Sequence, residues 1–177
     1  MIGKQLHVTP IEALTSEAFI TPYNSEKMPY IKKPARGTGL WTSTWREETQ
    51  DSAWIEWCCG NGFGEPYKEN WHILTPPENT KLFVVDSMMD FHRLLRYYGY
   101  EDEKMKSYGM HRTHIDFERM IQEYDGIWLT EQGNTETHLS DPDDLNYWDC
   151  ESILWFKWCF TSVERIETPQ PVMTVEM

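Results

Sequence analysis

The stretch ESILWFKWCF, residues 151–160, opens with one carboxylate and continues as an almost unbroken apolar run. A short run of this kind predicts a strand that is buried on both faces, so we place it near the centre of a sheet. The next segment, SVERIE (162–167), is expected to form the strand beside it.

Glu151 is the most informative residue of this stretch. Side chains alternate between the faces of a strand, so Glu151 shares a face with Ile153 and Trp155. A carboxylate fixed there is partly desolvated, which is how a protein holds negative charge against positive charge that develops in a reaction. The alternative is a glutamate at the strand end that points to water.

The rest of the chain divides into strands, helices and loops. Alternating or β-branched runs predict four more strands: KQLHVT (4–9), GLWTST (39–44), KLFVVD (81–86) and GIWLT (126–130). Capping residues and helical spacing predict three helices: DSAWIEWCC (51–59), the segment that follows Ser87, and IDFERMIQEY (115–124). Residues 11–36, 60–80, 100–106 and 131–150 are expected to be loops, and the last is long enough to be functional.

The order of these elements predicts the fold class. Strands, a helix, a strand, two helices and further strands indicate an α+β fold around a mixed or antiparallel sheet. With 177 residues, the chain is long enough for one domain with a sizeable core. We expect a single domain over residues 1–177, with its core between about 4 and 167 and a tail from 168 to 177.

Composition and charge exclude several classes of protein. The net charge is −13, which argues against tight binding to a phosphate backbone. It leaves open a small anionic ligand in one basic pocket, brief contact with nucleic acid, or an acidic surface that fits a basic partner. The mean hydropathy is −0.64, and without a long apolar run we expect no membrane-spanning helix and no signal peptide. Four cysteines without a C-x-x-C pair predict reduced thiols in a cytoplasmic protein.

Metal and nucleotide motifs are weak in this sequence. It has no G-x-G-x-x-G after a strand, no P-loop, no H-E-x-x-H and no G-x-S-x-G. His111 and His114 are spaced for one helix face but lack a third ligand nearby, so a solvated helix start is the alternative. The acidic cluster Asp141, Asp143 and Asp144 lacks the glycine and final glutamate of a calcium loop. We therefore expect no bound metal.

Taken in order, these segments resemble the ADP-ribosyltransferase superfamily over most of residues 4–160. The similar segments are LHVT (6–9), GLWTST (39–44), SAWIEW (52–57), KLFVVDSMMD (81–90), YDGIWLT (124–130) and CESILWF (150–156). They resemble, respectively, the family's first strand L-H-G-T, its second strand G-I-Y-F-A/T, the following helix, two later strands and the strand that carries the catalytic glutamate. Val8 stands where the family has Gly, and Trp41 where it has Tyr.

The resemblance implies a fold and an activity. The fold is one domain of two packed mixed or antiparallel sheets with flanking helices. The pattern is most similar to members with a His, Tyr, Glu triad, such as diphtheria-toxin-like enzymes, and the matching residues are His7, Trp41 and Glu151. The implied activity is mono-ADP-ribosyl transfer from the co-substrate NAD to a macromolecular acceptor, protein or nucleic acid, with release of nicotinamide.

The resemblance also implies residue roles. Trp41 would stack on nicotinamide with Ser43 near its ribose, and His7 would hydrogen-bond the adenosine ribose. Glu151 would bind the nicotinamide ribose and stabilise an oxocarbenium-like transition state, and Asp149 would orient the acceptor. The remaining candidates for contact with NAD are Thr9, Ser52 and, for the pyrophosphate, Arg36, Lys32 and Lys33. A surface charge cluster is the alternative interpretation of those three basic residues.

Two functions therefore stay open. The first is a cytoplasmic mono-ADP-ribosyltransferase, as a toxin, a defence effector or a phage-encoded modifier, with an antitoxin or other regulator as a further partner. The second is a non-enzymatic acidic binding or inhibitor protein of phage or bacterial origin. The enzyme requires His7, Trp41 and Glu151 to converge on one cleft, whereas the binding protein requires none of them.

Overall fold

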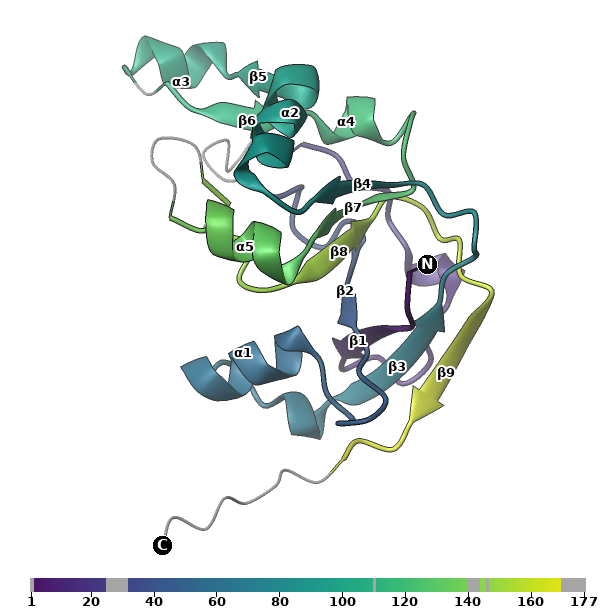
Figure 1. The fold of residues 1–177 in the computed structure, drawn as a ribbon. Coiled ribbons are helices and arrows are strands. Elements are labelled where there is room, and N and C mark those ends of the chain that lie inside the picture. Colours follow the sequence, from purple (N-terminus) through teal and green to yellow (C-terminus); the bar gives the residue numbers. More distant parts are fainter. Residues whose placement is uncertain (1, 25–31, 110, 140–143, 146, 170–177) are drawn as a thin grey trace, which may run out of the picture.

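In the described part of the chain, seven strands form one mixed sheet of order β4-β7-β8-β2-β1-β3-β9, and two more form the separate pair β5-β6 (Figure 1). The computed structural model describes residues 2–24, 32–109, 111–139, 144, 145 and 147–169. The strands are β1 Gln5–Thr9, β2 Leu40–Thr44, β3 Asn70–Thr75, β4 Leu82–Val85, β5 Gly99–Glu101, β6 Thr113–Ile115, β7 Gly126–Leu129, β8 Ser152–Trp155 and β9 Ser162–Ile166. The helices are α1 Ala53–Asn61, α2 Met88–Tyr98, α3 Glu103–Ser107, α4 Phe117–Met120 and α5 Glu131–Thr137, with short 3-10 turns at Ser16–Ala18 and Pro66–Lys68.

This architecture confirms one domain that mixes helices and strands around a mixed sheet. It differs from two packed sheets because β2 joins both halves of the sheet. β2 pairs with β8 through Leu40–Thr42 and with β1 through Ser43 and Thr44. In Figure 1, β4, β7 and β8 lie above β2, and β1, β3 and β9 lie below it.

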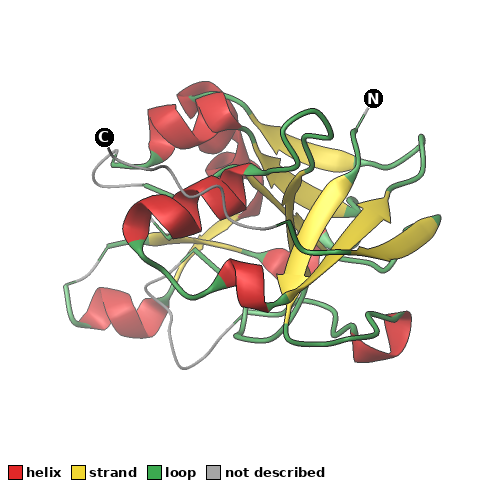
Figure 2. Ribbon diagram, turned by 90° about the horizontal axis from the view of Figure 1, so that it is seen from below, coloured by secondary structure: helices red, strands yellow, loops and turns green. Residues whose placement is uncertain are grey.

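Hydrophobic clusters fix the helices to this sheet. α2 packs Phe91, Leu94 and Tyr98 against Phe83 and Val85 of β4. A second cluster lies between α1 and strands β1 and β3, and its buried members are Leu6, Trp45, Ile55, Trp71 and Ile73. Most helices gather to the left of the strands in Figure 2. No helix of the described ranges is long and apolar enough to cross a membrane.

Four of the predicted strands and two helix starts are confirmed. β1, β2, β4 and β7 fall within the predicted ranges. α1 begins after Ser52, whose hydroxyl accepts the Ile55 N–H at 3.4 Å. α2 begins after Ser87, whose hydroxyl accepts the Asp90 N–H at 3.2 Å and donates to the Asp90 carboxylate at 2.8 Å.

Within the described residues, the predicted loops contain four strands and α-helices that the sequence did not indicate: β3 in 60–80, most of β5 and of α3 in 100–106, and α5 in 131–150. β3 lies within the predicted loop 60–80, because glycines and prolines on both sides mask its short run. Its residues Trp71 and Leu74 are fully buried. α5 begins the predicted loop 131–150, where the Thr130 hydroxyl caps the helix by accepting the Gly133 N–H at 3.0 Å.

Three further predictions were wrong in extent or in pairing. The predicted helix 115–124 shrinks to α4, because Thr113–Ile115 pairs as β6 with β5. The predicted strand 151–160 shrinks to β8, third in the sheet order as expected of a central strand. β9 pairs with β3 and not with β8, because the chain leaves β8 and Thr161 donates its N–H to the Thr75 carbonyl at 2.9 Å.

Candidate functional site

A pocket of about 350 Å³ opens between β1, β2, α1 and the segment that leads into β8. Its walls are rich in aromatic side chains: Trp41, Trp54, Phe63 and Trp148. His7, Lys33 and Asp149 contribute ionisable groups to the same walls. A few polar groups in a mostly aromatic pocket are typical of a site for a planar organic ligand.

Neighbouring side chains hold Trp41 in the pocket wall. Its ring meets that of Trp148 edge-on, with centroids 4.7 Å apart and an interplanar angle of 71°. The Trp148 indole N–H donates to the Lys32 carbonyl at 2.7 Å, which fixes Trp148 in turn. The Lys33 ammonium lies 5.6 Å from the Trp41 ring centroid and pairs with Asp149 at 3.3 Å. Trp41 therefore already takes part in one cation–π contact.

His7 is neutral at physiological pH. Burial lowers its pKa to about 4, and the nearby His72 adds to this effect against the opposing hydrogen bond with Trp41. His7 Nδ1 lies 2.8 Å from the Trp41 carbonyl oxygen. Since a carbonyl only accepts, Nδ1 carries the proton and Nε2 is left as an acceptor. Such an acceptor suits a ligand hydroxyl.

The Glu151 carboxylate is buried and accepts four hydrogen bonds. Oε2 accepts from the Ser43 hydroxyl at 2.8 Å and from the Thr44 N–H at 3.0 Å. Oε1 accepts from the Thr44 hydroxyl at 2.8 Å and from the Trp128 indole at 2.7 Å. The residue is only 5% exposed, so the alternative of a strand-end glutamate in water is wrong. These donors hold the carboxylate in one orientation.

Ser43 connects this carboxylate to the pocket. Glu151 itself is not among the described residues that line the pocket, whereas its neighbours Cys150 and Ser152 are. Ser43 lines the pocket and donates to Glu151, and its oxygen accepts the Trp54 N–H at 3.3 Å. The negative charge thus lies directly behind the Ser43 hydroxyl.

A larger cavity of about 1050 Å³ adjoins the pocket and shares His7, Lys33 and Trp41 with it. Arg36 lines this cavity together with the backbone of Gly37. Lys32 lies apart, buried with its ammonium 5.6 Å from the Phe91 ring centroid. Two of the three predicted basic residues therefore border one continuous space.

Two other predicted contacts lie outside the pocket walls. Thr9 ends β1, and its hydroxyl accepts the Ile11 N–H at 3.3 Å. Ser52 is fully buried as the N-cap of α1. Both side chains have local structural partners, which gives each a role without a ligand.

Sequence reasoning missed the side chains that hold Glu151 and Trp41 in place. Thr44 and Trp128 hold Glu151, and Trp148 supports Trp41. The available signal for Trp148 was its position directly before Asp149. The signal for Trp128 was its place in a predicted strand, but only the pairing of β7 with β8 brings it beside Glu151.

The weak metal motifs form no cluster in the part of the chain that the structure describes. His114 is buried in β6, not at a helix start, and its ring lies 5.5 Å from that of Tyr100. Asp141 and Asp143 lie outside the described residues. Among the residues with described positions, no group of three or more His, Cys, Asp and Glu is arranged to hold a metal ion.

The four cysteines are free thiols, as predicted. Cys58 and Cys150 are buried, Cys159 is partly buried and Cys59 is exposed. Burial raises the pKa of Cys150 to about 12 and that of Cys58 to about 11. These protonated thiols are poor nucleophiles, although Cys150 borders the pocket.

Comparisons with protein-family models, curated proteins and solved structures gave no match to this chain.

Proposed function

We propose that this chain transfers ADP-ribose from NAD to a macromolecular acceptor and releases nicotinamide. The observation that carries the proposal is the convergence of His7, Trp41 and Ser43 on one aromatic pocket, with Glu151 one hydrogen bond behind Ser43. Residues far apart in the sequence meet there.

The pocket chemistry fits the parts of NAD. Nicotinamide in NAD is a planar cationic ring, and the Trp41 and Trp54 faces offer it stacking and cation–π attraction. His7 Nε2 offers an acceptor to a ribose hydroxyl. Lys33 and Arg36 border the adjoining cavity, where positive charge suits a pyrophosphate.

Glu151 supplies the negative charge that the reaction requires. When the bond between nicotinamide and ribose breaks, positive charge develops on the ribose. A carboxylate that is already oriented and shielded from water stabilises this charge without reorganising. In this proposal the Ser43 hydroxyl contacts the ribose, and Glu151 acts from behind it.

The second candidate is a non-enzymatic acidic binding or inhibitor protein. The four hydrogen bonds to Glu151 favour it, because a carboxylate satisfied by the protein needs no ligand. Under this alternative the acidic surface of the chain, with its net charge of −13, would contact a basic partner.

Nicotinamide release from NAD distinguishes the two candidates. Wild type, Glu151→Gln and the control Glu103→Gln would be compared with cell lysate as the source of acceptor. Glu103 is a suitable control because its side chain is 84% exposed on α3. The proposal predicts release by wild type and by the control, and at least about a hundredfold less by Glu151→Gln, the loss typical of a removed electrostatic stabiliser.

Far-UV circular dichroism would show that each variant is folded. No release by folded wild type, or equal release by Glu151→Gln, would contradict the proposal and leave the binding protein.

A further inference from the structure

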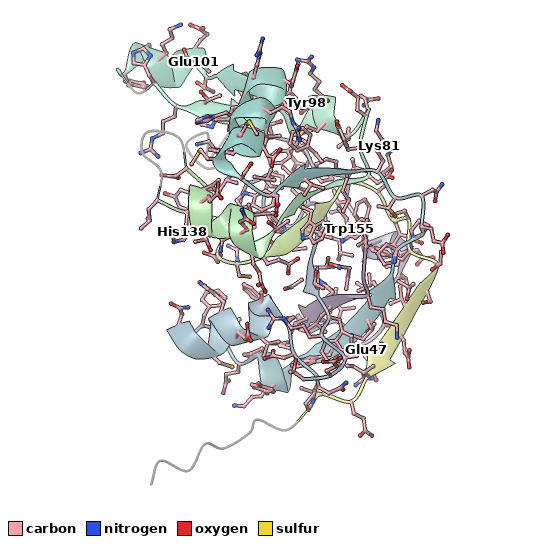
Figure 3. The ribbon with its side chains drawn as sticks, in the orientation of Figure 1. Glu47, Lys81, Tyr98, Glu101, His138 and Trp155 are labelled. Atoms are coloured by element: carbon pink, nitrogen blue, oxygen red, sulfur yellow. The ribbon has the colours of Figure 1, made fainter. Side chains whose placement is uncertain are left out.

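A hollow of about 370 Å³ follows the outer edge of β4, at one end of the seven-stranded sheet. Leu82, Phe83 and Val84 all line it. Consecutive side chains of a strand point to opposite faces of the sheet, so a hollow that three of them share runs along the edge of the strand. Figure 3 labels Lys81, which precedes β4, and Tyr98 on α2. The other described lining residues come from α2 and from the segment after α4: Arg93, Tyr97, Tyr98, Glu123 and Tyr124.

The backbone of β4 has hydrogen-bonding groups that face this hollow. On the inner side β4 pairs with β7, and the Val85 carbonyl accepts the Thr130 N–H at 3.1 Å. Successive residues of a strand turn their N–H and C=O groups to alternate sides, so those of Leu82 and Val84 turn away from β7. No described strand pairs with β4 on that side, and both residues are partly exposed.

The two edge strands of the sheet differ in sequence. β9 presents Glu164 and Arg165, which are both exposed, and such charges protect an edge from pairing with another chain. β4 has the sequence LFVV (82–85), which carries no charge and is rich in β-branched residues. An edge of this kind accepts an extended peptide, whose backbone supplies affinity and whose alternate side chains supply specificity.

Three aromatic rings beside this edge pack against one another and hold cations. Phe83, Tyr98 and Tyr124 meet edge-on, with centroids 5.4 to 6.1 Å apart and interplanar angles of 75° to 86°. Cation–π contacts of this kind place a charge without neutralising it. Each ring has one cation at 4.9 to 5.4 Å from its centroid: Arg93 at Phe83, Arg119 at Tyr98 and Lys81 at Tyr124.

The charge at this edge is positive, although the whole chain carries −13. Glu123 is the one carboxylate among the described lining residues, against the three cations. Lys81 and Arg119 form no ion pair within the described part of the chain, so both are available to carboxylates of a partner. Two other carboxylates nearby are already paired: Asp90 with Arg93 and Asp125 with Lys157, each at 3.0 Å.

We propose that the β4 edge binds an extended acidic segment of a partner protein, which adds to the sheet as a strand beyond β4. Its backbone pairs with the outward N–H and C=O groups of Leu82 and Val84. Its acidic side chains meet Lys81 and Arg119, and its apolar side chains cover Tyr97, which is 53% exposed. A second copy of this chain fits the edge less well, because pairing β4 with β4 about a two-fold axis brings the cations of both copies together.

Peptide binding and amide exchange test this inference without NAD. The probes are two end-blocked octapeptides, one that alternates Val with Glu and one that alternates Val with Lys, and binding is followed by fluorescence anisotropy. Exchange of backbone amide hydrogens is followed by NMR with and without the Val/Glu peptide. Val84→Pro removes an outward N–H from an edge strand, where proline is tolerated, and Lys81→Gln removes one cation. The matched control is Arg165→Gln, which removes an exposed cation from the other edge strand.

The inference predicts that the Val/Glu peptide binds at least about tenfold more tightly than the Val/Lys peptide, because opposite charges meet at the edge. Bound peptide should slow exchange at Leu82 and Val84 but not at Phe83, whose N–H faces β7. Val84→Pro should weaken binding about tenfold, the loss of one backbone hydrogen bond and its unpaired partner. Lys81→Gln should weaken it about two- to fivefold, and Arg165→Gln should match wild type.

Three results would overturn the inference: equal binding of the two peptides, no binding of the Val/Glu peptide at about 1 mM, or binding that leaves exchange at Leu82 and Val84 unchanged. Exchange there that slows with protein concentration alone would also overturn it, by assigning the edge to a second copy. Far-UV circular dichroism would show whether Val84→Pro is folded. If it is not, amide exchange in wild type and the comparison of Lys81→Gln with Arg165→Gln decide the question.

Discussion

Replacing Glu151 by Gln should destabilise the fold by an amount that depends on Trp128. Two of the four donors to the carboxylate, the hydroxyls of Ser43 and Thr44, can rotate to another acceptor. The Thr44 N–H and the Trp128 indole N–H cannot. A Gln amide has one oxygen, so in either orientation its NH₂ group faces one of these fixed donors.

The magnitude follows from that mismatch. One buried donor without an acceptor costs about 1–3 kcal/mol, so Glu151→Gln should lower the free energy of unfolding by this amount. Trp128→Phe removes one fixed donor and one hydrogen bond to a charged group, worth about 1.5–3 kcal/mol. In the double variant the amide nitrogen turns toward the vacated side. The combined loss should then be at least about 1 kcal/mol smaller than the sum, within the range seen for contacting residues.

Urea denaturation followed by far-UV circular dichroism gives the four free energies of this cycle. Ser87→Ala serves as an independent reference, because it removes a helix cap in another part of the fold. Losses that add to within about 0.5 kcal/mol, or a Glu151→Gln variant as stable as wild type, would refute the hydrogen-bond network described for Glu151.

Three further predictions concern the rest of the fold. The pKa of His7 falls from its ordinary 6.5 to about 4 on folding. The contribution of neutral His7 to the stability of the fold is therefore fully present above pH 6.5 and declines toward pH 4. The free energy of unfolding, measured by denaturation, should fall by about 2 kcal/mol between pH 7 and pH 5. A His7→Asn variant with the same pH dependence as wild type would contradict this. Gly133→Ala would place a methyl group 2.1 Å from the Val85 carbonyl oxygen. The variant should lower the free energy of unfolding by at least about 3 kcal/mol, as thermal unfolding would measure. An unchanged melting temperature would show that α5 packs elsewhere. Ser87→Ala should lower the free energy of unfolding by about 1 kcal/mol. An unchanged midpoint in urea denaturation would contradict the capping role of Ser87.

The sequence predicts elements whose signals are local. The Ser87 and Asp90 capping box starts α2 as expected, because both halves of the signal lie within one turn. The same holds for Ser52 at the start of α1. β3 was missed because its flanking glycines and prolines dominate the local pattern, while its burial depends on β1 and β9, which are distant in the sequence.

The candidate site likewise divides into residues that were expected before the structure and partners that were not. The family resemblance, and not residue type or strand position alone, implied His7, Trp41 and Ser43 as candidates, and all three line one pocket. Alternation along a strand left two alternatives for Glu151, a buried carboxylate or a strand-end glutamate in water, and it did not indicate the partners of the buried carboxylate that the structure shows. Those come from β2 and β7, and only tertiary pairing brings Thr44 and Trp128 to the same carboxylate.

The most direct measurement is calorimetric titration of NAD into wild type and Trp41→Ala. The account predicts binding by wild type that weakens at least about tenfold in Trp41→Ala, the loss of one stacked aromatic contact. Circular dichroism would confirm that the variant is folded. No binding of NAD by wild type, or equal binding by both proteins, would contradict the assignment of this pocket to NAD.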